Sequence, residues 1–345
     1  MTHHLKPDQF YPGFRILEVT DDFLVGAKGY KLYRLNSTDN RWRPLAKVID
    51  LKNSLLSGNL LTRRFFRAEL TRHYSLTDGT QLCIGRKSVF RRGPEDKNFT
   101  RCFSVPRGTR PLGICRCRNG FLCFGEYFAN RNKGEVHIYG SYDSGKTWEV
   151  VFTFPENEIN HIHGIFQDPW SDHLWIVTGD LGDECMIAKT TDYFKTLNVL
   201  FRGGQEFRTT TLYFYHDLIA FATDSEHIPN RIRYFTRKTL AIRDVCEVQG
   251  SIIKGGQCGS LSFFSTAVEK SVVNRSKKCF IWVSKDGLNW KEIFCDKKDF
   301  LPLNLFQFGT FEFPDYQMSE TQKLYFYGRG LIHTCGKSAS VKLDI

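Results

Sequence analysis

Two histidines separated by a single residue, His161 and His163, are the first candidates for chemistry in this sequence. Alternate residues of a β-strand point to the same side, so a strand over residues 161–166 would direct both imidazoles into one cavity. Such a pair can act as a general base, contact a substrate or bind a divalent metal ion. A metal would need a third ligand, for which Gln205 and Glu126 are the nearest candidates. Our default expectation is that no cofactor is bound, and a divalent metal at the two histidines is the alternative.

Three carboxylates, Glu126, Asp180 and Glu184, stand just beyond segments that read as strands. Glycoside hydrolysis needs two carboxyl groups beside the scissile bond, one as acid and the other as nucleophile or base. Tyr127 and the two histidines offer a different chemistry, in which a base abstracts a proton while Arg or a metal neutralises a uronate carboxylate. Carboxylates among many arginines can also be turn formers or ion-pair partners. These residues therefore predict a hydrolase or a lyase, with a purely structural role as the alternative.

Arg110, Arg208 and Arg329 occupy similar places beside expected strands, as do Gln205 and Asp224. A guanidinium group binds carboxylate or sulfate through paired hydrogen bonds. With 48 Lys and Arg against 37 Asp and Glu, the formal charge is 48 − 37 = +11, which either favours an anionic partner or reflects a generally basic surface. No nucleic-acid-binding motif accompanies these residues, so we expect an acidic glycan as the partner and no nucleic acid.

A recurring motif indicates which elements bring these residues together. The clearest copy, residues 141–148, reads Ser-Tyr-Asp-Ser-Gly-Lys-Thr-Trp, and weaker copies occupy residues 190–197, 284–290 and 37–42. Asp143 and Asp192 are 49 residues apart, and Asp192 and Asp286 are 94 apart, or twice 47. A period of about 45–50 residues is typical of the four-stranded blade of a β-propeller.

These segments resemble the Asp-box of the BNR-repeat, sialidase-like β-propellers of the glycoside hydrolase superfamily. Phe14-Arg15-Ile16-Leu17 is similar to the Phe-Arg-Ile-Pro element of sialidases. The resemblance implies an all-β propeller in which the motif is structural: its Asp holds its own turn, and its Trp packs between neighbouring blades. It also implies a carbohydrate as the ligand.

Dividing 345 residues by 49 predicts about seven four-stranded antiparallel blades, with six as the alternative, in a single domain over residues 1–345. The predicted strands are 110–117, 121–127, 134–141 and 147–154; 161–166, 173–180, 185–190 and 196–201; 208–215, 218–224, 231–235 and 241–248; and 307–313, 324–328, 331–335 and 340–343. In such a fold the motif turns join third and fourth strands on one face. The loops between second and third strands and the crossings between blades emerge on the other face. Because the candidate residues fall in those loops and crossings, we expect them to surround one opening.

Several protein classes are excluded by what the sequence lacks. No run approaches the roughly 18 apolar residues of a membrane helix, and the first residues contain no apolar signal core. We therefore expect a cytoplasmic protein without a membrane partner. The eleven cysteines include no Cys-x-x-Cys pair, which argues against a zinc knuckle. Most of them read as small apolar residues on strands in a reducing compartment.

The main hypothesis is a carbohydrate-active propeller that hydrolyses an acidic poly- or oligosaccharide. The alternatives are a polysaccharide lyase and a non-catalytic glycan-binding or scaffold propeller. The predicted catalytic residues are Glu126, Tyr127, His161, His163, Asp180 and Glu184. The predicted substrate-binding residues are Arg110, Gln205, Arg208, Asp224 and Arg329.

Overall fold

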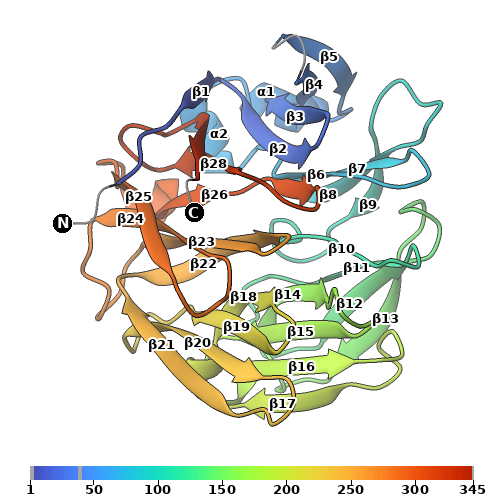
Figure 1. Cartoon of the computed structure of the whole chain (residues 1–345). Helices are drawn as coiled ribbons and strands as arrows, with labels where there is room; N and C mark the ends of the chain where they lie inside the picture. Colours follow the sequence, from blue (N-terminus) through green and yellow to red (C-terminus); the bar gives the residue numbers. More distant parts are fainter. Residues whose placement is uncertain (1–3, 38–40, 344–345) are drawn as a thin grey trace.

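Short antiparallel strands joined by tight turns make up most of the chain in the computed structural model, which describes residues 4–37 and 41–343. The faint motif copy at residues 37–42 therefore falls partly outside the described residues. The strands form successive four-stranded sheets that radiate around a central axis (Figure 1). First strands of neighbouring sheets contact one another, as β2 does β6 and β14 does β18. The chain therefore folds as a β-propeller, and its sheets make seven blades.

The strands of each blade follow one another along the chain until the last blade. Blade 1 contains β2 (Arg15–Thr20), β3 (Phe23–Lys28), β4 (Lys31–Asn36) and β5 (Trp42–Lys47), and blade 2 contains β6 (Arg72–Ser75), β7 (Gln81–Gly85), β8 (Ser88–Arg92) and β9 (Thr100–Ser104). Blade 3 contains β10 (Cys115–Arg116), β11 (Leu122–Gly125), β12 (Val136–Ser141) and β13 (Glu149–Phe154), and blade 4 contains β14 (His161–Gln167), β15 (Leu174–Gly179), β16 (Met186–Thr190) and β17 (Asn198–Arg202). Blade 5 contains β18 (Thr209–Phe214), β19 (Leu218–Thr223), β20 (Asn230–Thr236) and β21 (Ile242–Val248), and blade 6 contains β22 (Ser251–Cys258), β23 (Leu261–Val268), β24 (Lys278–Ser284) and β25 (Lys291–Lys297).

Blade 7 is assembled from both ends of the chain. It contains β26 (Gly309–Glu312), β28 (Lys323–Arg329) and β29 (Lys337–Lys342), and its outer strand is β1 (Gln9–Pro12), which pairs antiparallel with β29. The prediction of a strand at residues 331–335 was therefore wrong. That segment forms the turns between β28 and β29, and the N-terminal strand supplies the fourth position. The short β27 (Asp315–Gln317) adds to β2 in parallel, and a β23–β26 pair joins blades 6 and 7.

We expect Tyr11→Ala to weaken this closure of the ring. Tyr11 is buried on β1, with its ring centroid 6.3 Å from that of Trp42 in blade 1 and 6.2 Å from that of Tyr325 in blade 7. Truncating a large buried aromatic side chain costs about 3–5 kcal/mol. Phe10→Ala is the matched control, because Phe10 is 44% exposed on the same strand. Urea unfolding that showed equal losses for the two variants would contradict a role of Tyr11 in closure.

The recurring motif forms turns between third and fourth strands. Asp143 accepts hydrogen bonds from the backbone N and the hydroxyl of Thr147, at 2.9 and 2.7 Å. Trp148 packs its ring 6.3 Å from that of Phe103 in blade 2 and 4.9 Å from that of Phe124 in blade 3. The motif thus stabilises the turn and the contact between blades.

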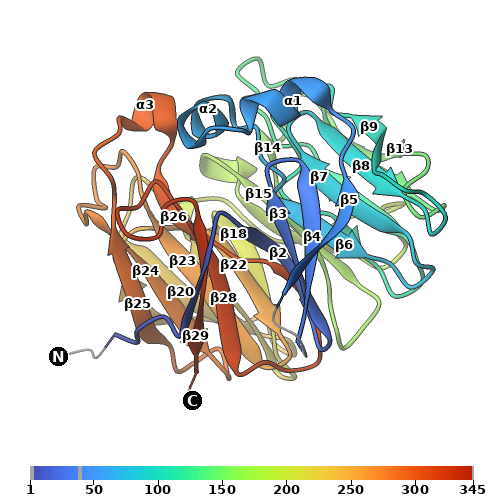
Figure 2. The same cartoon turned by 90° about the horizontal axis from the view of Figure 1, so that it is seen from above.

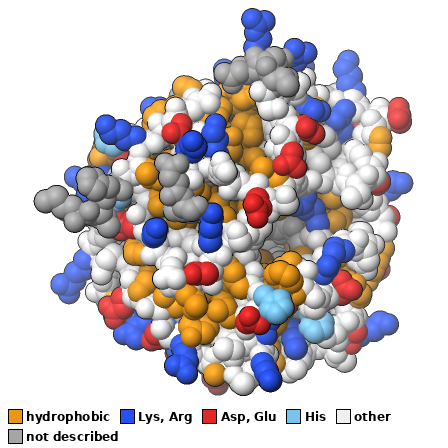
Figure 3. All heavy atoms as spheres, viewed as in Figure 1, with side chains coloured by type: hydrophobic (Ala, Val, Ile, Leu, Met, Phe, Trp, Pro, Cys, Tyr) orange, Lys and Arg blue, Asp and Glu red, His pale blue; other side chains and the backbone are white. Residues whose placement is uncertain are grey.

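Figure 3 shows acidic, basic and apolar side chains interspersed on the face seen in Figure 1, without one dominant basic patch.

The part of the chain that the structure describes contains three short α-helices, all in connections between blades: α1 (Leu51–Leu56), α2 (Leu60–Phe66) and α3 (Leu303–Phe306). They lie side by side at one end of the molecule (Figure 2). Asp50 and Asn59 start the first two, because their side chains accept hydrogen bonds from the backbone N of Asn53 and Leu61. Each helix is too short to give the sequence a recurring helical pattern. Among the helices of the described residues, none has the length and apolar character needed to cross a membrane.

Candidate functional site

A cavity of about 780 Å³ opens among the crossings between blades and the loops that join second and third strands. We call it the main cavity. Of the residues singled out in the sequence, those that line it are Arg110, Tyr127, His161, Asp180, Arg208, Asp224 and Arg329. They come from blades 3, 4, 5 and 7, so the fold brings together side chains that are far apart in the chain.

The two histidines begin β14 and are both buried. The Nδ1 atom of His161 lies 3.0 Å from the carbonyl oxygen of Phe128, and that of His163 lies 2.9 Å from the carbonyl oxygen of Thr209. Their Nε2 atoms face each other at 3.0 Å. Burial lowers the pKa of His163, and this effect outweighs the opposing influence of the adjacent Asp180 carboxylate.

Asp180 completes this cluster from the end of β15, where Gly179 lies opposite His161 in the sheet. Its Oδ1 atom is 3.4 Å from the Nε2 atom of each histidine. The amide of Asn160 donates to Oδ2 at 2.5 Å. Burial alone would raise the pKa of Asp180, but the two imidazoles beside its Oδ1 atom hold it well below its ordinary value.

Asp224 follows β19 and is buried in the wall of the main cavity. Burial raises its pKa well above the ordinary value, and the nearby Glu269 and Asp180 act in the same direction. Arg208 lies between the two aspartates, with Nη2 3.4 Å from Asp180 Oδ1 and Nε 3.8 Å from Asp224 Oδ2. One guanidinium thus adjoins a carboxyl group whose pKa is lowered and another whose pKa is raised, and such a difference distinguishes a base from an acid in several enzymes.

A group of cationic side chains lines the rest of the main cavity: Arg67, Arg110, Lys254 and Arg329. We call it the cationic group. Among the described residues, no carboxylate lies within 4.0 Å of the charged nitrogens of Arg67, Arg110 or Lys254. Arg110 instead donates to the carbonyl oxygen of Arg67 at 3.2 Å. Burial lowers the pKa of Lys254 to about 7 and that of Arg110 to about 10. Unneutralised cations of this kind favour an anionic ligand.

Arg15, from the segment similar to the sialidase element, does not reach the main cavity. It is buried and pairs with Glu69, at 2.9 Å, and with Glu312. Arg329 shares Glu312, with Nη1 2.8 Å from Oε1. This ion-pair network holds β2, β26 and β28 together beneath the cavity, and it leaves Arg329 partly neutralised.

Four of the predicted residues lie outside the lining of the main cavity: His163, which lines a smaller neighbouring cavity, and Glu126, Glu184 and Gln205. Glu126 is buried, pairs with Arg107 and accepts from the backbone N of His137 at 3.0 Å. Glu184 pairs with Lys133. Gln205 supports the cluster, since its amide donates to the carbonyl oxygen of Asp180 at 2.7 Å. These contacts give the last three side chains structural partners.

Glu126→Gln separates a structural from a catalytic role for this carboxylate. Because the Arg107 guanidinium would lose its buried partner, we expect the free energy of unfolding to fall by about 1–3 kcal/mol. Turnover by the folded variant should be unchanged, since Glu126 does not line the main cavity. Denaturant unfolding and steady-state kinetics check both expectations. A loss of kcat of the size expected for a general acid would instead assign Glu126 to catalysis.

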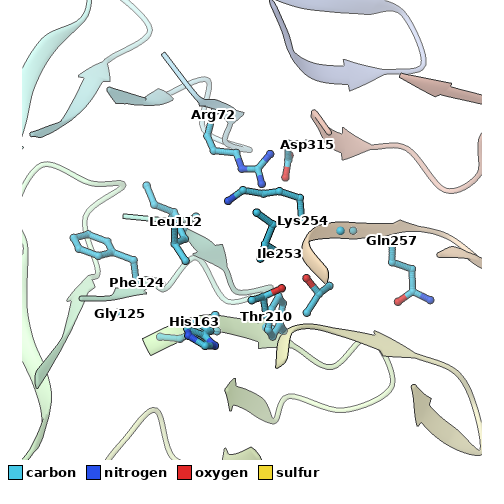
Figure 4. A pocket seen from close by; sticks show the side chains of 18 of the residues that line it. Arg72, Leu112, Phe124, Gly125, His163, Thr210, Ile253, Lys254, Gln257 and Asp315 are labelled. Carbon is cyan, nitrogen blue, oxygen red and sulfur yellow. The ribbon is translucent and has the colours of Figure 1, made fainter. Parts of the chain in front are cut away.

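A smaller cavity of about 250 Å³ continues along the axis and shares Arg72, Leu112, Thr210, Ile253 and Lys254 with the main cavity. In Figure 4, Arg72 and Lys254 lie on one side of this cavity and His163 and Thr210 on the other. Lys254 is therefore positioned where the two cavities meet.

Sequence reasoning missed Lys254, Arg67 and Asn160. Lys254 lies on the first strand of blade 6, in Ser-Ile-Ile-Lys-Gly-Gly, a segment in which no strand was predicted. A search of first strands for polar residues would have found it. Asn160 immediately precedes His161, so the signal was its position next to the histidine pair.

Within residues 4–37 and 41–343, two sets of side chains converge closely enough to hold a metal ion: His161, His163 and Asp180, and the buried cysteines Cys115, Cys117 and Cys123. In each set the candidate ligand atoms lie within 4.8 Å of one another. The cysteine set contains Cys115 on β10, Cys117 just after that strand, and Cys123, which lies opposite Cys115 on β11. It sits in the apolar core between blades 3 and 4, whereas the histidine set borders the main cavity.

Comparison with known proteins identifies the fold of the chain but assigns it to no family. No protein-family model and no curated protein matches the chain. Among solved structures, YCF48 from Cyanidioschyzon merolae is similar with a TM-score of 0.56 and 13% identity, over 99% of both chains. A GH74 enzyme from Niastella koreensis is similar with a TM-score of 0.55 and 14% identity. A chain of a mitotic checkpoint complex has a TM-score of 0.57 and 9% identity, over 98% of this chain and 95% of that one.

These likenesses support the propeller fold alone. The match to the GH74 enzyme covers 84% of this chain but 47% of that protein, about half its length. Because one fold hosts enzymes as well as proteins without catalytic activity, the propeller fold alone assigns no function, and the residues of the main cavity carry the functional information.

Proposed function

We propose that the protein is an enzyme that cleaves an acidic oligosaccharide in the main cavity. One observation carries the proposal: a cavity of about 780 Å³ is lined both by the cationic group and by the side chains of His161, Asp180 and Asp224. Arginine and lysine suit the carboxylate or sulfate of an acidic sugar. Histidine and paired carboxyl groups supply the acid and base that cleavage of a glycosidic bond needs.

Hydrolysis is the reaction that the two aspartates favour. Asp224, whose pKa is raised by burial, would donate a proton to the glycosidic oxygen as the bond to the leaving sugar breaks. A water molecule beside the His161–Asp180 cluster would add to the anomeric carbon and give its proton to that cluster. The two carboxyl groups flank one guanidinium, a spacing compatible with the roughly 5–9.5 Å found between paired glycosidase carboxylates.

A lyase is the second candidate, because Tyr127 packs against the histidine pair. Its ring centroid lies 4.3 Å from that of His161. Burial and the charges of Asp224 and Asp180 raise the pKa of Tyr127, which disfavours the deprotonated form that a base requires. In this reaction His161 would take the proton next to a uronate carboxylate held by the cationic group, and the leaving oxygen would depart to form a carbon–carbon double bond.

The test is a screen of uronate- and sialate-containing oligosaccharides with the wild type and with His163→Ala. New reducing ends without ultraviolet absorbance would support hydrolysis, and new reducing ends with absorbance would support the lyase. Either activity should fall in the variant. Saturable binding of a glycan without product would indicate a glycan-binding propeller, and equal turnover by both proteins would remove the histidine cluster from the reaction.

A further inference from the structure

Two nitrogen lone pairs are directed at each other in the cluster of His161, His163 and Asp180. Each Nδ1 atom adjoins a backbone carbonyl oxygen, which can only accept a hydrogen bond. Each Nδ1 atom therefore carries a hydrogen, and a neutral imidazole then has none on Nε2. Because the Nε2 atoms are 3.0 Å apart, their lone pairs repel unless a cation lies between them.

Asp180 adds a negative charge to the same point. Its Oδ1 atom lies 3.4 Å from both Nε2 atoms, which is longer than the roughly 2.7–3.2 Å of an N–H···O hydrogen bond. Atoms that bind one metal ion at about 2.1 Å are separated by such distances when the angle at the metal is roughly 90–110°. The spacing is therefore that of ligands around one ion.

The surroundings fix all three side chains in this arrangement. The carbonyl oxygens of Phe128 and Thr209 orient the rings, and Asn160 holds the second oxygen of Asp180 at 2.5 Å. These supports come from blade 3, blade 5 and the residue preceding β14. Outer contacts of this type orient metal ligands and strengthen binding.

We propose that His161, His163 and Asp180 bind one divalent transition-metal ion, such as Zn²⁺. Two imidazoles and one carboxylate suit this class of ion. Three protein ligands leave further positions for water or a sugar oxygen, as in catalytic rather than structural sites. Asp180 and His161 line the main cavity, so those positions can face it. An ion bound to both Nε2 atoms would occupy the lone pairs that could otherwise take a proton, so in the metal-bound protein a water molecule on the ion would supply the nucleophile. Only this catalytic use of the ion rests on the proposed function.

A shared proton is the competing way to relieve the lone-pair repulsion. It would join the two Nε2 atoms but would leave Asp180 Oδ1 at 3.4 Å from each of them. Metal binding distinguishes the two, because only the metal site takes up an ion.

The experiment titrates the full chain, freed of metal by a chelator, with Zn²⁺ in a calorimeter and with Co²⁺ in a spectrophotometer. We expect one ion per chain and weak visible bands without an intense thiolate charge-transfer band. His163→Ala and Asp180→Asn should each weaken binding by at least tenfold. Two controls should bind like the wild type: His173→Ala, a histidine on the opposite face, and Cys123→Ala, in the three-cysteine set. Circular dichroism confirms that each variant is folded.

Absence of a bound ion in the wild type would overturn the proposal and favour the shared proton. Binding lost in Cys123→Ala but retained in His163→Ala would assign the ion to the cysteines and would also overturn it. Since no glycan is present in the titration, its outcome is separate from that of the glycan screen.

Discussion

Replacing Asp224 with asparagine is expected to lower kcat on an acidic oligosaccharide by roughly 10²–10⁴-fold, the contribution of a positioned general acid. Asparagine preserves the shape of the side chain but has no acidic proton to give to the leaving sugar. Substrate affinity should change little, because the cationic group remains intact. Steady-state kinetics of the wild type and Asp224→Asn measure both quantities, and a variant with full kcat would exclude Asp224 as the acid.

The pH dependence offers an independent check on Asp224. Its pKa is raised by burial and by Glu269, Asp180 and Glu226, against the opposing charge of Arg208. The folded protein therefore holds this proton at pH values where the unfolded chain has lost it. Stability from this group is present below the unfolded pKa, near 4, and declines as pH rises through the folded pKa. Enzymatic activity should fall over the same range, as pH rises through the pKa of Asp224 in the folded protein.

Asp224→Asn should abolish that part of the pH dependence of stability. Urea unfolding at acidic and at mildly alkaline pH should show that the free energy of unfolding of the variant increases relative to that of the wild type as pH rises. A difference between the two proteins that stays constant with pH would mean that Asp224 is ionised in the folded state.

Lys254→Met is expected to weaken binding of an acidic oligosaccharide by roughly 10–100-fold, the value of a hydrogen bond to a charged group, while making the folded protein more stable. Lys254 has no carboxylate partner among the described residues, and burial lowers its pKa to about 7. Its ammonium group is therefore costly in the free protein and gains a partner only with an anionic ligand. Calorimetric titration and denaturant unfolding measure the two effects.

The way in which the stability of the folded protein changes with pH follows from the lowered pKa of Lys254. Between about pH 7 and the unfolded pKa near 10.4, the unfolded chain binds the proton and the folded protein does not. Wild-type stability therefore rises with pH across this window, and the advantage of Lys254→Met is largest below pH 7. An advantage independent of pH, or an unchanged affinity, would contradict the role assigned to this lysine.

The recurring motif predicted most of the fold because its stabilising contacts join residues that are close in sequence. The Asp143 turn is closed by hydrogen bonds to a residue four positions away, so its signal survives in the sequence. The strand predicted over residues 161–166 is observed as His161–Gln167. Ring closure leaves no comparable signal, since Gln9 pairs with Ser340 at the other end of the chain.

The candidate site was predictable as a location but not in its contacts. Topology places loop and crossing residues on one face, which is why His161, Asp180 and Arg208 line one cavity. Which side chains touch depends on strand register: His161 lies opposite Gly179, which brings Asp180 rather than Gln205 or Glu126 to the histidines. The partner of Glu126, Arg107, lies in a loop that no sequence pattern connects with it.

Binding of an acidic glycan beside the cationic group is the central property of the proposed enzyme. Titration calorimetry with a uronate oligosaccharide tests this directly, using the wild type, Arg110→Ala and the control Arg243→Ala, whose arginine is exposed on the outer strand β21. We predict saturable binding of one glycan per chain, weakened by at least tenfold in Arg110→Ala and unchanged in Arg243→Ala. Equal affinities for all three proteins, or no binding by the wild type, would contradict the account.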